Sequence, residues 1–177
     1  MNARDAVKAP YASSARDAIL AAIRSAGVPY APPAAPVVRT SAPEDLLVQF
    51  QRMLRDVGGT AVLSNGASID AMLTATFGAA RGAAVVVVGR FAVAENGAVY
   101  VDASDLRART DVVSTEQLVI VVSAASIVET MHEAMPLVPR GSSCGWFLSG
   151  PSKTADIEQS LVIGAQGSKT LHVFLTR

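Results

Sequence analysis

Two apolar runs that do not alternate with polar residues constrain the fold of this chain more than any other feature. They are Ala83–Val88 and Gln117–Val122. A strand that is buried on both faces has this composition, and such strands are typical of parallel sheets. Ser68–Phe77, whose apolar residues repeat at helical spacing, separates the first run from a short predicted strand at Thr60–Leu63. Because strand, helix and strand in this order imply right-handed crossovers, we expect a three-layer α/β fold with a largely parallel sheet.

A β-hairpin is predicted to interrupt this pattern. Phe91–Glu95 and Ala98–Val101 flank Asn96-Gly97, the dipeptide most typical of a two-residue hairpin turn. After the second buried strand we expect a helix over Ala125–Met135. The last predicted strand is Leu171–Leu175, and the hairpin is the one insertion that we expect in the parallel sheet.

The N-terminal region is predicted to form an arm. A helix is expected from Ser14 to Arg24, and the segment from Val28 to Pro43 contains five prolines and few charges. A second helix is expected to begin with Pro43 in its first turn and to continue to Leu54. We therefore predict residues 1–43 to be an N-terminal helix with a proline-rich connector, and residues 44–177 to be the α/β domain.

The composition excludes several classes of protein. Lys plus Arg equal Asp plus Glu at 15 each, without a basic block, so nucleic acid is not an expected partner. One cysteine, Cys144, cannot by itself hold an iron–sulfur cluster or a zinc ion, so we expect neither metal nor cofactor in this chain. No run of about 20 apolar residues predicts a membrane span, and charges near the N-terminus argue against a signal peptide. The expected location is cytoplasmic.

The most polar stretch of the chain runs from Gly150 to Gly167. It lies between the strand-type runs Trp146–Leu148 and Leu171–Leu175, so we expect a tight turn at Gly150-Pro151, a helix over residues 152–163 and a second turn. Backbone N–H groups at such a helix start attract anions. Four side chains of this predicted site are candidate ligand-binding groups: Ser152, Lys153, Thr154 and Asp156. The competing interpretation is a capped helix start with a solvated Asp–Lys pair and no ligand.

Two motifs in this chain resemble those of a known family. The run GPSKTADIEQSLVIGAQG, followed by LHVFL, is similar to the C-terminal signature GPSRTADIE…LVxGvHGP of the lactate-utilization protein C family, the LUD domain. The upstream run FAVAENG, at residues 91–97, resembles that family's FAIAETG motif. Both motifs occur in the expected order, and the resemblance covers the chain from Val85 to its end.

The resemblance implies a fold and a role. The implied fold is the one shared by ribose-5-phosphate isomerase, glucosamine-6-phosphate deaminase and CoA transferases, which place their ligands at the carboxyl ends of the strands. Glu95 and Asn96, in the upstream motif, are therefore added to the candidate ligand-binding residues, and Glu95 is a candidate catalytic carboxylate. The implied role is that of a subunit or accessory of a cytoplasmic system that oxidises lactate to pyruvate, together with iron–sulfur partner proteins.

The chain departs from the family pattern at four positions, one of which is Ser168 in place of a proline. Lys153 replaces the usual arginine, so charge is kept but bidentate geometry is lost. Gln166 and Gln117 stand where the family has histidines, which weakens any expectation of metal binding or proton transfer.

Two other functions remain open at the level of sequence. One is a free-standing enzyme that acts on a phosphorylated sugar or a CoA ester, with Glu95 as base or nucleophile. The other is a binding module for a small carboxylate or phosphate. A small anionic ligand is common to all these hypotheses.

Overall fold

The computed structural model describes residues 11–27, 43–155 and 161–177. It divides the chain into two compact units, residues 1–37 and 38–177. In the first unit, α1 (Tyr11–Ser25) is a helix whose Ile19 and Ile23 side chains are exposed. The predicted proline-rich connector lies mostly outside the described residues.

The second unit contains the remaining helices and all strands of the described chain. The helices are α2 (Pro43–Asp56), α3 (Ile69–Phe77) and α4 (Met131–Ala134), with short 3-10 turns η1 (Gly78–Ala83), η2 (Ala103–Asp105), η3 (Arg109–Val112), η4 (Ala124–Ser126) and η5 (Met135–Leu137). The strands are β1 (Thr60–Leu63), β2 (Ala84–Val88), β3 (Phe91–Val93), β4 (Ala98–Asp102), β5 (Gln117–Ser123), β6 (Ile127–Val128), β7 (Gly145–Leu148), β8 (Lys153–Ala155), β9 (Leu161–Ile163) and β10 (Thr170–Thr176).

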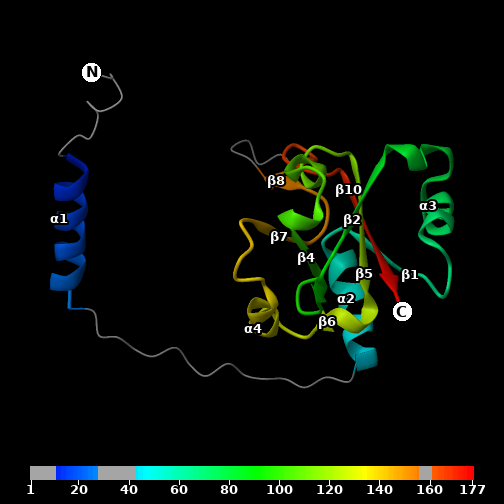
Figure 1. The fold of residues 1–177 in the computed structure, drawn as a ribbon, viewed down its shortest axis with the longest axis horizontal. Coiled ribbons are helices and arrows are strands. Elements are labelled where there is room, and N and C mark those ends of the chain that lie inside the picture. The colour runs from blue at the N-terminus through cyan, green and yellow to red at the C-terminus, as the bar shows by residue number, and fades with distance from the viewer. Residues whose placement is uncertain (1–10, 28–42, 156–160) are drawn as a thin grey trace. The chain divides into compact units, whose positions relative to one another are not determined.

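A four-stranded parallel sheet forms the centre of this unit, in the order β1-β10-β5-β2 (Figure 1). The α/β class and the parallel sheet are thus confirmed. The predicted hairpin of β3 and β4 forms, but it does not enter the parallel sheet. It belongs to a second sheet with the order β6-β3-β4-β7, in which β4 pairs antiparallel with β7 and β3 pairs parallel with β6.

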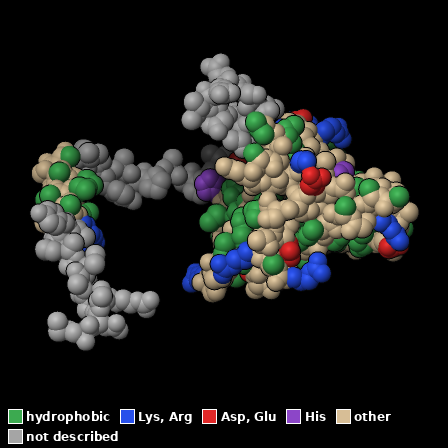
Figure 2. Space-filling view, turned by 90° about the horizontal axis from the view of Figure 1, so that it is seen from above, with side chains coloured by type: hydrophobic (Ala, Val, Ile, Leu, Met, Phe, Trp, Pro, Cys, Tyr) green, Lys and Arg blue, Asp and Glu red, His purple; other side chains and the backbone are tan. Residues whose placement is uncertain are grey.

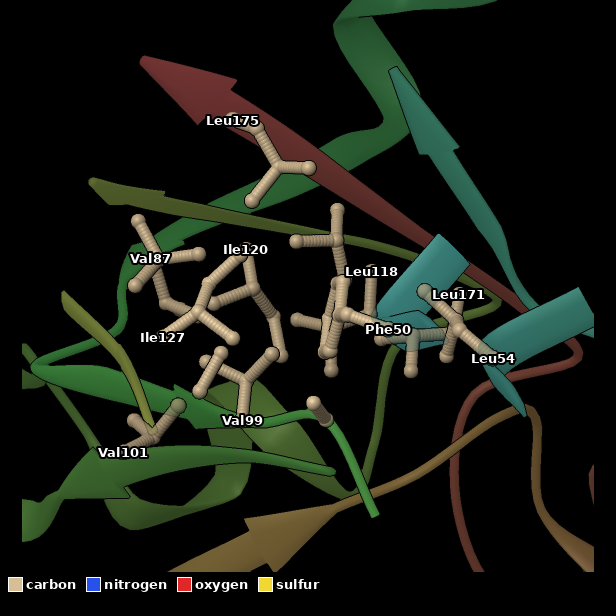
Figure 3. Packing of buried hydrophobic residues seen from close by; sticks show 14 of the residues in the cluster. Phe50, Leu54, Val87, Val99, Val101, Leu118, Ile120, Ile127, Leu171 and Leu175 are labelled. Carbon is tan, nitrogen blue, oxygen red and sulfur yellow. The ribbon is translucent and has the colours of Figure 1, made fainter. Parts of the chain in front are cut away.

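The main hydrophobic core lies between the two sheets. Ile120 of β5 lies near Val99 of β4, and Phe50 of α2 lies beside Leu118 and Leu171 in the same cluster (Figure 3). The opposite face of the parallel sheet packs against α3, and the second face of the mixed sheet packs against α4. Burial of large apolar side chains, at about 1.5–3 kcal/mol each, makes this core the main source of stability.

Besides the placement of the hairpin, three local predictions were wrong. The strand β2 is not covered on both faces, because it lies at the edge of its sheet and leaves Val86 and Val88 39% and 57% exposed. The helix predicted over Ala125–Met135 is broken into short pieces, since Ile127 and Val128 instead pair with β3 as strand β6. The third is the helix predicted over residues 152–163.

In place of that helix, the structure has a two-stranded antiparallel ribbon of β8 and β9, in which Lys153 is paired with Ile163. Residues 156–160 lie outside the described residues. The β-branched residues Thr154, Val162 and Ile163 favour an extended backbone, and their cross-strand pairing outweighs the helical spacing of the polar residues.

Candidate functional site

The two sequence motifs meet in space. Ser149, directly before the Gly-Pro turn, donates a hydrogen bond from its hydroxyl to the carbonyl oxygen of Asn96 at 2.7 Å. The Asn96 side chain closes its own turn, because its Oδ1 accepts a hydrogen bond from the N–H of Ala98 at 3.0 Å. Residues that are 53 positions apart in sequence are therefore held in one arrangement.

Both motifs also rest on the C-terminal end of α2. Gly97 and Gly150 have positive φ angles of 67° and 77°. A Cβ on Gly97 would lie 2.6 Å from the backbone nitrogen of Leu54, and a Cβ on Gly150 would lie 2.7 Å from the carbonyl oxygen of Val57. Only glycine allows both this backbone conformation and this close approach. The helix end therefore fixes the position of the two turns relative to each other.

A pocket of about 300 Å³ lies beside the Gly-Pro turn. Its walls are the strand β7, the turn Ser149–Ser152, the turn Gln166–Ser168 and the end of η3. The lining residues are Val112, Val113, Trp146, Phe147, Leu148, Ser149, Gly150, Pro151, Ser152, Gln166, Gly167 and Ser168. We call it the signature pocket. None of its described lining residues carries a formal charge.

Ser152 connects the two turns that line the signature pocket. Its N–H donates to the carbonyl oxygen of Ser168 at 2.9 Å, and its carbonyl oxygen accepts from the N–H of Gly164 at 2.9 Å. A Cβ on Gly167 would lie 3.0 Å from the Cβ of Ser152, so a glycine there leaves room for the serine side chain. Because the backbone N–H of Ser152 already has an acceptor, it is not a free donor for an anion.

Lys153 lies away from the pocket lining and close to the end of α2. Its ammonium nitrogen is 3.2 Å from the position that a Cβ on Gly58 would take. A cation near a helix C-terminus is favourable by about 0.3–1 kcal/mol, because the last carbonyl groups carry partial negative charge. The predicted mechanism, in which a helix start and Lys153 together attract an anion, is therefore wrong in its geometry: β8 is a strand and Lys153 points toward a helix end.

Glu95 is exposed in the hairpin turn that follows β3, and it is not part of the signature pocket. Its Oε2 accepts a hydrogen bond from the N–H of Met131 at 2.9 Å, at the first turn of α4. Its own N–H donates to the carbonyl oxygen of Glu129 at 3.0 Å. The structure thus gives Glu95 a helix-capping contact, apart from the signature pocket that Ser152 lines.

The other candidate residues fall into separate places. Thr154 pairs with Val162 in the β8–β9 ribbon, and Asp156 lies outside the described residues. Gln166, at the position of a family histidine, lines the signature pocket with Ser152. Gln117 is elsewhere, at the start of β5, where its buried Oε1 has no hydrogen-bond partner among the described residues.

Sequence reasoning missed Ser149 as the residue that joins the two motifs. A small hydroxyl residue directly before a Gly-Pro turn was the available signal, but its partner, a backbone carbonyl, has no sequence signature. Other pocket contacts depend on how two turns pack against each other, which local patterns do not show.

The described part of the chain contains neither a group of metal-ligating side chains nor a membrane-spanning helix. Within it, no group of three His, Cys, Asp or Glu side chains is placed to hold a metal ion. No helix among the described residues has the length and apolar character needed to cross a membrane. On the face shown in Figure 2, basic and acidic side chains are interspersed rather than gathered into one patch.

Comparisons with known proteins define the class of this chain. The family model of the LUD domain matches residues 49–176, which is well over half of the sequence. The chain therefore belongs to the LUD-domain family, whose members are associated with lactate utilization.

A solved structure supports the same fold. It is a DUF162 family protein from Deinococcus radiodurans, which is similar over 78% of this chain and 100% of its own, with 17% sequence identity and a TM-score of 0.62. At this identity the likeness concerns the fold alone. No curated protein matches the sequence.

Proposed function

We propose that this chain is a lactate-utilization protein C-like component of a cytoplasmic lactate-oxidation system. Its LUD domain binds a small organic acid or its product in the signature pocket, and iron–sulfur partner proteins carry the electrons. The observation that carries this proposal is the junction of the two family motifs, Ser149 to Asn96 at 2.7 Å, directly beside that pocket.

The size of the pocket supports a small ligand. Ligand pockets range over about 300–1,000 Å³, so a volume of about 300 Å³ suits a compact molecule better than a CoA ester. Of the polar side chains that line the pocket, we assign the ligand contacts to the hydroxyl of Ser152 and the amide of Gln166, and Trp146 supplies an apolar wall. Hydroxyl and amide groups can bind a carboxylate or a hydroxyl group without a formal charge.

The chain's own residues favour a partner for electron transfer. An iron–sulfur cluster needs several thiolates, whereas the sequence contains Cys144 alone. In this proposal Lys153 is a positioning residue that secures β8 to the end of α2, rather than a ligand contact.

Binding to the purified full-length chain tests the ligand. Isothermal titration with lactate, pyruvate, ribose 5-phosphate and CoA should show binding of the first two and weaker binding of the others. Each neutral hydrogen bond contributes about 0.5–1.5 kcal/mol, so Ser152→Ala and Gln166→Ala should each weaken binding about 2- to 10-fold. Ser114→Ala, at an exposed serine outside the signature pocket, is the matched control and should leave affinity unchanged.

Growth of the source cell on lactate tests the role. Deletion of the gene should reduce lactate-dependent growth, and the parent chain should restore it while Ser152→Ala restores it poorly. Normal growth of the deletion strain, together with turnover of a phosphosugar or CoA ester by the purified chain that Glu95→Gln abolishes, would favour the free-standing enzyme instead.

A further inference from the structure

A second pocket, distinct from the signature pocket, has a volume of about 320 Å³. It lies where the start of the hairpin, the end of β4 with η2, the start of η3 and the loop before β7 come together. We call it the arginine pocket, because Arg90 and Arg109 both line it, along with Ser104, Ser142 and Ser143. The family motifs do not include any of these five residues.

The buried carboxylate of this pocket, Asp102, already accepts hydrogen bonds from neighbouring residues. Asp102 is 2% exposed, and its oxygens accept hydrogen bonds from the Ser104 hydroxyl at 2.7 Å, the Ser104 N–H at 2.9 Å and the Tyr100 hydroxyl at 3.0 Å. Hydrogen bonds from the Ser142 and Ser104 hydroxyls are the main reason that the pKa of Asp102 lies far below its usual range. The hydrogen-bonding capacity of the Asp102 carboxylate is therefore met by the protein itself, and the carboxylate does not need a cationic ligand.

Arg90 is also paired. Its Nε lies 2.6 Å from Oδ2 of Asp105, its Nη2 lies 3.0 Å from Oδ1 of the same carboxylate, and Nη2 also donates to the Ser104 hydroxyl at 3.0 Å. This fork-to-carboxylate geometry neutralises the Arg90 charge and holds the guanidinium at the pocket wall.

Arg109 is different, because no carboxylate lies within ion-pair distance of it among the described residues. One of its nitrogens, Nη2, donates to the Ser143 hydroxyl at 3.2 Å. A guanidinium has five N–H donors in a planar fork, so most of the Arg109 donors remain open to a ligand. Arg109 is exposed while Asp102 is buried, so an entering ligand meets the cation more directly than the carboxylate.

We propose that the arginine pocket binds the oxyanion group, carboxylate or phosphate, of a small metabolite. The Arg109 fork takes two oxygens of the anion, and the Ser143 hydroxyl beside it supplies a further polar contact. The proposal does not depend on the signature pocket, since the two pockets share no lining residue.

Gly141 offers a way to block this pocket without touching its charges. It lines the pocket, it is exposed, and a Cβ added to it would have no atom within 4 Å. Gly82, in η1 and outside the pocket, has the same open surroundings and is the matched control. For the charge itself, Arg107 is an exposed arginine of the same loop that does not line the pocket, so it is the matched control for Arg109.

The experiment is titration of the full-length chain with inorganic phosphate and, separately, with acetate, at low and at high salt. We expect at least one of the two to bind, Arg109→Gln to weaken that binding tenfold or more, and Arg107→Gln to weaken it less than twofold. Gly141→Leu should abolish binding, and Gly82→Leu should not. If phosphate binds, the metabolite is a phosphate ester; if acetate binds, it is a carboxylic acid.

The proposal would be overturned if neither phosphate nor acetate binds. An equal effect of Arg107→Gln, which would indicate diffuse charge, or full binding by Gly141→Leu would also overturn it. If lactate binds with an affinity that Ser152→Ala lowers and Arg109→Gln does not, the signature pocket functions independently. The two proposals can therefore fail separately.

Discussion

The hydroxyl of Ser149 lies 2.7 Å from the carbonyl oxygen of Asn96, and this contact joins the hairpin turn of the mixed sheet to the Gly-Pro turn after β7. Each turn also contacts the end of α2 through a glycine. The family motifs therefore specify a junction of three backbone segments before they specify any side-chain chemistry. A ligand pocket beside such a junction has walls that do not depend on long, mobile side chains.

The glycine contacts with α2 should be essential for stability. In Gly97→Ala, the alanine has to adopt a left-handed backbone conformation, which destabilises the fold by about 1–2 kcal/mol. Its Cβ would also lie 2.6 Å from the Leu54 nitrogen, and this overpacking costs a further amount of about 1–3 kcal/mol. Gly66→Ala is the matched control, because Gly66 has φ +87° and no atom within 4 Å of the added Cβ.

Urea unfolding of both variants measures the difference. We expect Gly97→Ala to lower the free energy of unfolding more than Gly66→Ala does, by the cost of overpacking, about 1–3 kcal/mol. Equal losses for the two variants would mean that α2 moves away from the hairpin turn at little cost.

Removal of the Ser149 hydroxyl should have a smaller effect. Ser149→Ala leaves the Asn96 carbonyl oxygen without this donor, and loss of one such hydrogen bond costs about 0.5–1.5 kcal/mol. Thermal unfolding should show a lower Tm for Ser149→Ala than for Ser114→Ala, because Ser114 is an exposed residue whose hydroxyl has no such bond to the rest of the described chain. An unchanged Tm for Ser149→Ala would show that the glycine contacts alone hold the junction.

The sequence predicted the parallel sheet because β5 and β10 bury apolar runs at its centre, although the apolar run of the edge strand β2 is partly exposed. The dipeptide Asn96-Gly97 also predicted the hairpin, because this local motif favours a two-residue turn. The sequence did not predict that the hairpin joins a second sheet. The paired residues of β6 and β7 are 35 to 49 positions away from their partners in the hairpin, and they pair through backbone groups that every residue possesses.

Ligand binding by Ser152 and the other candidate residues stays a prediction. Ser152 lines the signature pocket, but the segment after it is a strand, so the anion chemistry assigned to a helix start does not apply to it. Helical spacing of polar residues over a short window is compatible with an extended ribbon, and only the pairing of Thr154 with Val162 decides between them. The arginine pocket was not predicted, because it combines four separate segments.

The ionised Asp102 should make stability depend on pH in the acid range. Its pKa is lowered in the folded chain, chiefly by hydrogen bonds from Ser142 and Ser104, while an unfolded Asp titrates near about 3.9. A lowered folded pKa means that the stabilisation is present above about pH 4 and is lost as the pH falls further.

Asp102→Asn tests this dependence. Asparagine replaces one acceptor oxygen by an NH₂ group that faces the same donors, so the variant should be less stable than the parent at pH 7. Urea unfolding at pH 7 and at pH 2.5 should show that this difference becomes smaller in acid. A difference that is the same at both pH values would indicate that the Asp102 charge contributes nothing to folding.

The partly buried His172 should give a second pH dependence at higher pH. Burial lowers the pKa of His172, its Nδ1 has no hydrogen-bond partner among the described residues, and its ring packs edge-on against Phe77 at 4.9 Å. Because the folded chain disfavours the protonated ring, the unfolded chain takes up the proton first as the pH falls below about 6.5, and stability decreases. His172→Phe keeps the ring contact and removes both the titration and the unpartnered nitrogen. Unfolding free energies at pH 8 and pH 5 should therefore differ less in the variant than in the parent, and an identical difference in the two proteins would assign the pH dependence to another group.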